Sequence, residues 1–206
     1  YYYNSLVYDN LGNIVVPNAI SDRINMLGGN YTYFTSNLTA KIELAQTISN
    51  QSISNVHAML NYTPNDNIKL EFKYQKLNSL PNLNYTLYQS RYVDYNWLNN
   101  FKNEKLNQLS FSAFTKWLNT SVQYKVLNDH LYFDNITDDI TKLTVKPMQY
   151  DKTINYFSVN ANKDIKFWKL GLDVTVLYQK VDQASDIVNV PELTTRSTLY
   201  FSDHVF

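Results

Sequence analysis

Side chains that could catalyse a reaction or hold a metal are few in this sequence. Asp129 and His130 could form the acid–base pair of a hydrolase. Asp138 and Asp139 could begin a calcium-binding loop, but solvated turn residues are the favoured interpretation of both pairs. The three histidines lie far apart without ligand spacing, and no phosphate loop, zinc-protease motif or nucleophile elbow occurs. We therefore predict no enzyme activity, no catalytic residue, no metal and no cofactor.

Polar side chains that recur at every second position are the stronger functional candidates. In a membrane barrel they would line the lumen and set its selectivity. This predicted lumen-lining set comprises Lys41, Glu43, Lys69, Glu71, Lys73, Gln75, Lys169, Asp173, Thr175 and Gln179. Charges of both signs predict weak ion selectivity. Alternatively, these charges pair across neighbouring strands and stiffen the wall, and the two roles are compatible.

The segment 165–180, IKFWKLGLDVTVLYQK, indicates which element positions such side chains. Its apolar residues from Trp168 to Tyr178 alternate strictly with mainly polar ones, which is typical of a strand with unlike faces. That stretch would extend roughly 33 to 36 Å, and a tilt of about 45° reduces this to roughly 25 Å, the height of a barrel's apolar band. An aromatic residue at each end of the row matches the interfacial girdles of membrane barrels.

A second pair of segments predicts a hairpin. Apolar and charged residues alternate over 68–76, whereas in a helix the same positions would leave no continuous apolar stripe. The residues 64–67, Pro-Asn-Asp-Asn, form a turn by composition, and 55–62 alternates on the other side of it.

The alternation recurs less clearly along the rest of the chain. We expect further strands at 37–48, 83–89, 107–117, 120–127, 153–161 and 192–202, short breaks at 118–120 and 162–164, and longer loops near 92–104, 134–143 and 181–191. The first 36 residues are interpreted as strand ends and a loop, before amphipathic strands over 37–206. The prediction is an all-β fold, residues 1–206 forming one antiparallel transmembrane β-barrel domain, a partial barrel of about ten or eleven strands from a larger one.

The opposite faces of these strands would contact lipid. This predicted lipid-facing and girdle set comprises Tyr62, Phe72, Tyr74, Trp117, Trp168, Leu170, Leu172, Val174, Val176 and Tyr178.

Composition excludes several classes of protein. The formal net charge of +0 argues against nucleic acid as a partner, and the absence of cysteine excludes disulfides and thiolate chemistry. No stretch of about 18 apolar residues exists to form a transmembrane helix. No export signal is visible at the start, which predicts that it has been removed or lies upstream.

A soluble all-β protein also shows period-two alternation on a sheet with one wet face. The membrane barrel is favoured because several segments alternate for nine or more residues, longer than the five or six usual in soluble domains. Tyr92, Tyr95 and Trp97 could stack on a sugar ring or lie at the membrane interface, and the interface is the favoured interpretation.

Two stretches, residues 89–101 (QSRYVDYNWLNNF) and residues 190–204 (VPELTTRSTLYFSDH), together with the strand at 165–180 between them, suggest a family. Over roughly residues 30–206 the chain resembles the putative porin family of Bacteroidetes, especially flavobacteria. The resemblance implies a large single-chain barrel in the bacterial outer membrane, of which these residues would be a fragment.

The sequence is consistent with three functions. The first is a porin-like passive diffusion channel for small polar solutes, and the second is a non-channel barrel subunit of a larger outer-membrane complex. The third is a soluble β-rich carbohydrate-binding module. The first two predict contact with outer-membrane lipid, and other outer-membrane proteins or further copies of the chain are possible partners.

Overall fold

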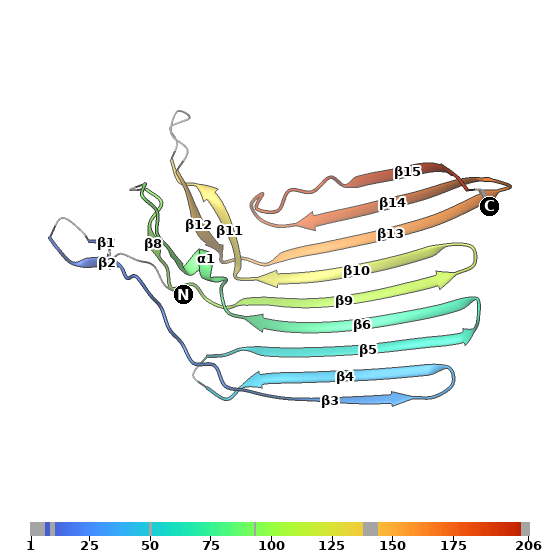
Figure 1. The fold of residues 1–206 in the computed structure, drawn as a ribbon, viewed down its shortest axis with the longest axis horizontal. Coiled ribbons are helices and arrows are strands. Elements are labelled where there is room, and N and C mark those ends of the chain that lie inside the picture. Colours follow the sequence, from blue (N-terminus) through green and yellow to red (C-terminus); the bar gives the residue numbers. More distant parts are fainter. Residues whose placement is uncertain (1–6, 9–10, 50, 93, 138–143, 203–206) are drawn as a thin grey trace.

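The computed structural model describes residues 7–8, 11–49, 51–92, 94–137 and 144–202. These residues form fifteen strands and one short helix, and the nine longest strands build a single antiparallel sheet (Figure 1). No helix in these ranges is long and apolar enough to cross a membrane. The prediction of an all-β antiparallel fold is confirmed.

The main sheet is an up-and-down meander of nine strands, each 9 to 14 residues long. In chain order they are β3 (Met26–Phe34), β4 (Leu38–Thr47), β5 (Ser54–Asn65), β6 (Ile68–Ser79), β9 (Glu104–Thr115), β10 (Asn119–Asn128), β13 (Ile154–Phe167), β14 (Leu170–Asp182) and β15 (Leu193–Phe201). Consecutive strands of this series pair antiparallel with each other. Each strand therefore crosses the sheet in the direction opposite to its neighbours.

The two ends of the sheet differ in the length of their connections. At one end, called the turn end, the connections are residues 35–37, 66–67, 116–118 and 168–169. At the other end, called the loop end, they are residues 48–53, 80–103, 129–153 and 183–192. Short turns at one rim and long loops at the other are the arrangement of outer-membrane barrels.

The long loops and the segment before β3 carry small elements of their own, called here the loop platform (Figure 1). It comprises β1 (Val7–Tyr8) paired with β2 (Ile14–Val16), the helix α1 (Leu83–Thr86), β7 (Leu87–Tyr88) paired with β8 (Trp97–Leu98), and β11 (His130–Asn135) paired with β12 (Val145–Tyr150). The buried apolar side chains of the described residues are Val16, Leu87, Trp97, Leu131, Tyr150 and Ile154. All but Ile154, at the loop end of β13, belong to the platform, so the main sheet has no apolar core of its own.

The pairing register shifts steadily across the sheet. Leu38 at the start of β4 pairs with Tyr62, but β5 continues past this level to Asn65. Asn119 at the start of β10 pairs with Asn162, and β13 continues to Phe167. Such a stagger accompanies strands that tilt around a barrel axis. The outer strands β3 and β15 do not pair with each other in the described residues, so the sheet is open.

One predicted strand proved to be two. The segment 165–180 was expected to be continuous, whereas residues 168 and 169 form the turn between β13 and β14, where Trp168 has a φ of 55°. The residues 162–164, expected as a break, lie within β13. A change of phase marks the turn, because Ile165 and Phe167 alternate out of step with Leu170 and Leu172.

Other element boundaries also differ from those expected from the sequence. Residues 83–88 form α1 and β7 instead of the single strand expected at 83–89, and residues 116–118 form the turn expected at 118–120. Within the expected loop 134–143, residues 138–143 lie outside the described ranges. The first 36 residues contain β3, a full edge strand whose Gly28 and Gly29 obscured the alternation. Gly28 is needed there because an added Cβ would lie 2.9 Å from the Leu44 carbonyl oxygen.

Candidate functional site: the polar face of the sheet

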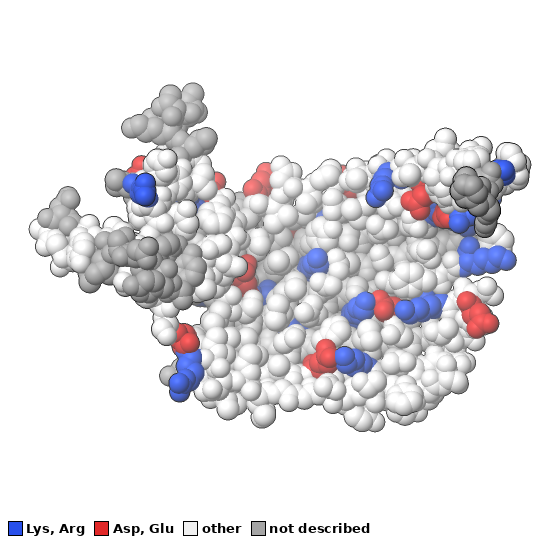
Figure 2. Space-filling model, in the orientation of Figure 1, with Lys and Arg blue, Asp and Glu red and all other residues white. Residues whose placement is uncertain are grey.

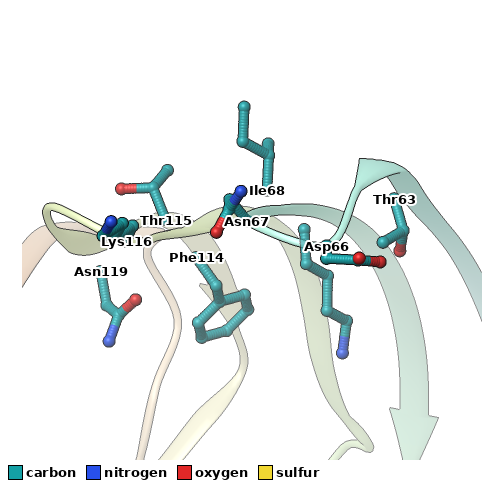
Figure 3. Close-up of a pocket in the computed structure, with 9 residues that line it drawn as sticks. Thr63, Asp66, Asn67, Ile68, Phe114, Thr115, Lys116 and Asn119 are labelled. Carbon is teal, nitrogen blue, oxygen red and sulfur yellow. The ribbon is translucent and has the colours of Figure 1, made fainter.

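The two faces of the main sheet differ in chemistry. Successive residues of a strand point to opposite faces, and paired residues on neighbouring strands share a face. Figure 3 shows this at the turn end, where Phe114 and Asn119 point to one side of the sheet while Ile68 and Thr115 point to the other. The pairing register therefore assigns every strand residue to one face.

One face, called the apolar face, presents rows of large hydrophobic side chains. One row, in pairing order, is Ala40, Leu60, Phe72, Phe111, Val122, Val159, Tyr178 and Leu193. Phe72 is 39% exposed and Phe111 is 43% exposed in the centre of the sheet. No element in the described part of the chain covers these side chains, although central residues of a soluble sheet would be buried.

The apolar face ends towards the loop end in polar residues. Lys76, Asn107, Asn155 and Lys180 occupy the next positions on this face. Tyr124 lies at the boundary, and its hydroxyl donates a hydrogen bond to Asn155 Oδ1 over 3.1 Å. A ring in an apolar layer with its hydroxyl at a polar edge is the usual placement of an interfacial tyrosine.

The opposite face, called the polar face, carries amide, hydroxyl and charged side chains on every central strand. One row, in pairing order, is Lys41, Met59, Lys73, Ser110, Gln123, Ser158 and Gln179. The Oδ1 atoms of Asn55 and Asn61, on the same face of β5, are shielded and accept no hydrogen bond from the described residues. The amide, hydroxyl and charged groups of the row, in contrast, can offer hydrogen bonds to water or to a polar solute.

Charges on β4 and β6 occur as adjoining pairs of opposite sign (Figure 2). Lys41 Nζ lies 2.6 Å from Glu43 Oε1, and His57 Nδ1 lies 3.4 Å from the other oxygen of Glu43. Lys73 pairs with Glu71 along β6, two positions away on the same strand. The pairing leaves both signs at the surface, because the side chains of Lys41 and Glu43 remain 36% and 39% exposed.

Side-chain hydrogen bonds link β13 to β14 on the polar face. Asn162 Nδ2 donates to Thr175 Oγ1 over 2.9 Å and to Asp173 Oδ2 over 3.1 Å. Tyr156 donates to Gln179 Oε1 over 2.9 Å, and Gln179 Nε2 donates to the carbonyl of Pro191 over 2.7 Å. Gln179 thus ties the connection 183–192 to the wall.

A pocket of about 360 Å³ opens at the turn end, between the turns 66–67 and 116–118 (Figure 3). Lys69 and Phe114 line it, with Lys69 Nζ 5.6 Å from the centre of the Phe114 ring. Asp66 and Lys116 lie at its rim, so charges of both signs surround its opening.

The structure places most of the predicted site residues on two opposite faces. Nine of the predicted lumen-lining residues share the polar face: Lys41, Glu43, Lys69, Glu71, Lys73, Gln75, Asp173, Thr175 and Gln179. Eight of the predicted lipid-facing residues share the apolar face: Tyr62, Phe72, Tyr74, Leu170, Leu172, Val174, Val176 and Tyr178. Lys169, Trp117 and Trp168 lie in turns, because the strands end before them.

Asp129 and His130 do not form the acid–base pair considered from the sequence. Asp129 Oδ2 accepts a hydrogen bond from Lys105 Nζ over 2.8 Å. His130 Nδ1 lies 3.1 Å from Glu104 Oε1, which also accepts from the backbone of Leu131. The two side chains of the candidate pair therefore have separate partners at the base of the β11–β12 hairpin. Asp138 and Asp139 lie outside the described residues.

An aromatic cluster on the loop platform was not predicted as a unit. Tyr88 stacks on Trp97 with ring centres 4.8 Å apart, and Tyr85 stacks on Phe133 at 4.7 Å. Trp97 Nε1 donates to the Asn84 carbonyl over 3.0 Å, and burial raises the pKa of the Tyr85 hydroxyl. Trp97 therefore belongs to a packed surface beyond the sheet, and Tyr95 lines the same pocket as Trp97 and Phe133. These rings come together from segments some 40 residues apart.

An antiparallel meander of long strands with one apolar face, one polar face, short turns and long loops has the architecture of the wall of a β-barrel. A family model described as "Putative porin" matches residues 1–206, and the chain belongs to that family.

The chain is also similar to part of a yeast protein. It is 30% identical over 172 residues to the SWI5-dependent HO expression protein 3 of Saccharomyces cerevisiae strains S288c and YJM789. The match covers 73% of this chain and 39% of that protein. The chain thus spans well under half the length of these relatives. Their name describes the yeast proteins and is not applied to this chain.

Proposed function

We propose that this chain forms part of the wall of an outer-membrane β-barrel that lets small polar solutes diffuse passively. The supporting observation is the uncovered apolar face of the main sheet, backed by an equally continuous polar face. Burying each large apolar side chain in hydrocarbon is worth about 1.5 to 3 kcal/mol, so a row crossing eight strands strongly favours lipid over water.

The dimensions of the apolar face fit a bilayer. On β13 its outermost aromatic residues are Phe157 and Phe167. Ten residues of strand rise about 34 Å, and a tilt of about 40° leaves about 26 Å along the membrane normal, near the ~25 Å apolar band of such barrels. Membership of the porin family supports the outer membrane of a bacterium as the location, and the resemblance described above suggests a member of the Bacteroidetes.

The polar face supports a channel with little charge preference. Lys41 with Glu43 and Lys73 with Glu71 form pairs of opposite charge, and many of its other groups are neutral amides and hydroxyls. Neutral hydrophilic solutes could exchange water for these groups without the cost of burying an unpaired charge. Small sugars and similar solutes are therefore the proposed class.

Conductance in planar bilayers tests the channel. Ser110 and Ser121 lie on the polar face, whereas Ala113 and Ala161 lie on the apolar face of the same region. We expect Ser110→Trp with Ser121→Trp to lower the single-channel conductance, and Ala113→Trp with Ala161→Trp to leave it unchanged. Inserted protein without any conductance would refute the open channel.

A closed barrel also requires partners for the edges β3 and β15. In hydrocarbon an unpaired backbone group costs several kcal/mol, so we propose that further strands of the same protein pair with both edges. Amides of β3 and β15 should then exchange with deuterium as slowly as those of β9 in the full-length protein. Rapid exchange confined to these two strands would contradict closure.

A non-channel subunit of a larger outer-membrane complex is the second candidate. The loop platform favours it, because a set of loops with its own buried core offers a firm binding surface. Stable co-purification of another outer-membrane protein, lost in Leu87→Ala, would support this candidate. A soluble carbohydrate-binding module is disfavoured by the apolar face, and partition of the purified chain into water without detergent would favour it again.

A further inference from the structure

The turn end of β13 and β14 carries a group of aromatic and basic residues that the channel does not use. We call it the basic aromatic rim and define it as Trp117, Lys163, Phe167, Trp168 and Lys169. It spans two neighbouring turns, 116–118 and 168–169, and the end of β13 between them. Trp117 is 76% exposed, Phe167 is 80% exposed and Trp168 is 82% exposed.

Each tryptophan of the rim lies under a lysine. Lys163 Nζ is 5.7 Å from the centre of the Trp117 ring, and Lys169 Nζ is 5.2 Å from the centre of the Trp168 ring. An ammonium over an indole is a favourable electrostatic contact. The two turns therefore present the same arrangement of ring and cation side by side.

Lys163 occupies an unusual position for a charge. It lies on the apolar face, opposite Val174 and between Ala161 and Ile165 on its strand. Its side chain leaves that face towards the turn end, where Nζ donates a hydrogen bond to the Lys116 carbonyl over 3.4 Å. A long side chain that carries its charge out of an apolar layer to the nearest polar level is typical of a membrane interface.

Among the described residues of β13, the carboxylate beside the rim is directed to the polar face. Asp164 accepts a hydrogen bond from Tyr200 over 2.8 Å and pairs with Lys166, and these groups belong to the polar face. Lys163 forms no ion pair with any described residue. The outer side of the rim therefore keeps positive charge next to exposed aromatic rings.

We propose that the basic aromatic rim binds the headgroups of anionic glycerophospholipids, with the rings among the glycerol groups and the Lys163 ammonium group on a phosphate. The inference rests on the proposed membrane barrel. Its own support is the charge and the continuity of the rim with the apolar face, which includes Ile165, Leu172 and Phe201 next to it. Tryptophan prefers the headgroup level, and lysine near an anionic leaflet gains electrostatic energy.

Tryptophan quenching by brominated lipid tests the proposal. The full-length protein is inserted into vesicles of two thirds phosphatidylcholine and one third phosphatidylglycerol, with either one or the other lipid brominated. Quenching per mole of brominated lipid then reports which lipid surrounds Trp117 and Trp168, while Trp97 is buried in the loop platform. We expect phosphatidylglycerol to be enriched about threefold around the two rings.

Two double variants assign the enrichment to the rim. Lys163→Gln with Lys169→Gln should abolish the enrichment, and Lys163→Arg with Lys169→Arg should retain it. Lys146→Gln with Lys152→Gln removes the same charge from the β12 region at the loop end and should leave the enrichment unchanged.

The quenching results distinguish failure of the headgroup site from failure of the proposed membrane barrel. Equal quenching by both lipids in the unaltered protein would overturn the headgroup site and leave the inserted barrel standing. No quenching by either lipid would overturn the membrane location of the rim, and the proposed barrel with it.

Discussion

The ring of Tyr200 on β15 lies directly over Gly171 on β14. A Cβ added to Gly171 would lie 2.1 Å from Tyr200 Cζ, closer than two non-bonded carbon atoms can approach. The two residues are paired across the strands, and the Tyr200 hydroxyl continues to Asp164 on β13. The absence of a side chain at Gly171 thus lets one aromatic residue link three strands.

Replacing this glycine should loosen the β13–β15 region. Gly171→Ala forces the Tyr200 ring away and breaks its hydrogen bond to Asp164, and we expect a loss of about 1 to 2 kcal/mol of unfolding free energy from overpacking at residue 171. Urea titration of the protein in vesicles measures it. Gly29→Ala is the matched control, since no atom lies within 4 Å of the added Cβ. Equal stability of the two variants would show that Tyr200 yields without cost.

The apolar face should reject charge far more strongly than the polar face. Phe111 and Ser110 are neighbours on β9 that point to opposite faces. Near the centre of a bilayer a lipid-facing lysine costs about 2 to 4 kcal/mol, so Phe111→Lys should be strongly destabilising and Ser110→Lys should change stability by less than about 1 kcal/mol. Folding titrations into vesicles compare the two variants. Similar losses at both positions would argue against lipid on the apolar face.

Removing the acidic partners on β4 and β6 should make the channel anion-selective. In Glu43→Gln with Glu71→Gln, the positive charges of Lys41 and Lys73 lose their partners and attract anions to the polar face. The reversal potential under a potassium chloride gradient should shift towards the chloride potential. Asp134→Asn with Asp151→Asn removes two acidic charges from the connection 129–153 at the loop end and should shift the reversal potential less. A reversal potential that stays constant in the first variant would place these pairs away from the ion path.

The loop platform should depend on a single buried leucine. Leu87 is 0% exposed and pairs across β7 and β8 with Leu98, which is 47% exposed. Leu87→Ala opens a cavity in the platform core and should lower the unfolding free energy by about 2 to 4 kcal/mol. Leu98→Ala shortens a half-exposed side chain and should cost much less. Limited proteolysis should cut the connection 80–103 much faster in Leu87→Ala alone, with the main sheet intact. Identical cleavage of both variants would indicate that the platform is held together elsewhere.

Much of the two-sided character of the sheet could be predicted from sequence. Side chains of an extended chain alternate between faces without help from any other residue, so Glu71 and Phe72 had to point apart once the segment was a strand. Alternation does not continue across a turn. Trp168 and Leu170 were placed in one row, whereas the two-residue turn puts Phe167 and Leu170 opposite each other.

By itself, the sequence determined that this protein is built of long strands with one apolar and one polar side, because alternation is a local property of each strand. Only the tertiary structure decided which strands are neighbours, how far their register is staggered, and that Val16, Leu87 and Leu131 are buried beyond the sheet. These features depend on hydrogen bonds and packing between residues far apart in the chain. A pattern read along one strand carries no information about the residue that will lie opposite it, as Gly171 and Tyr200 illustrate.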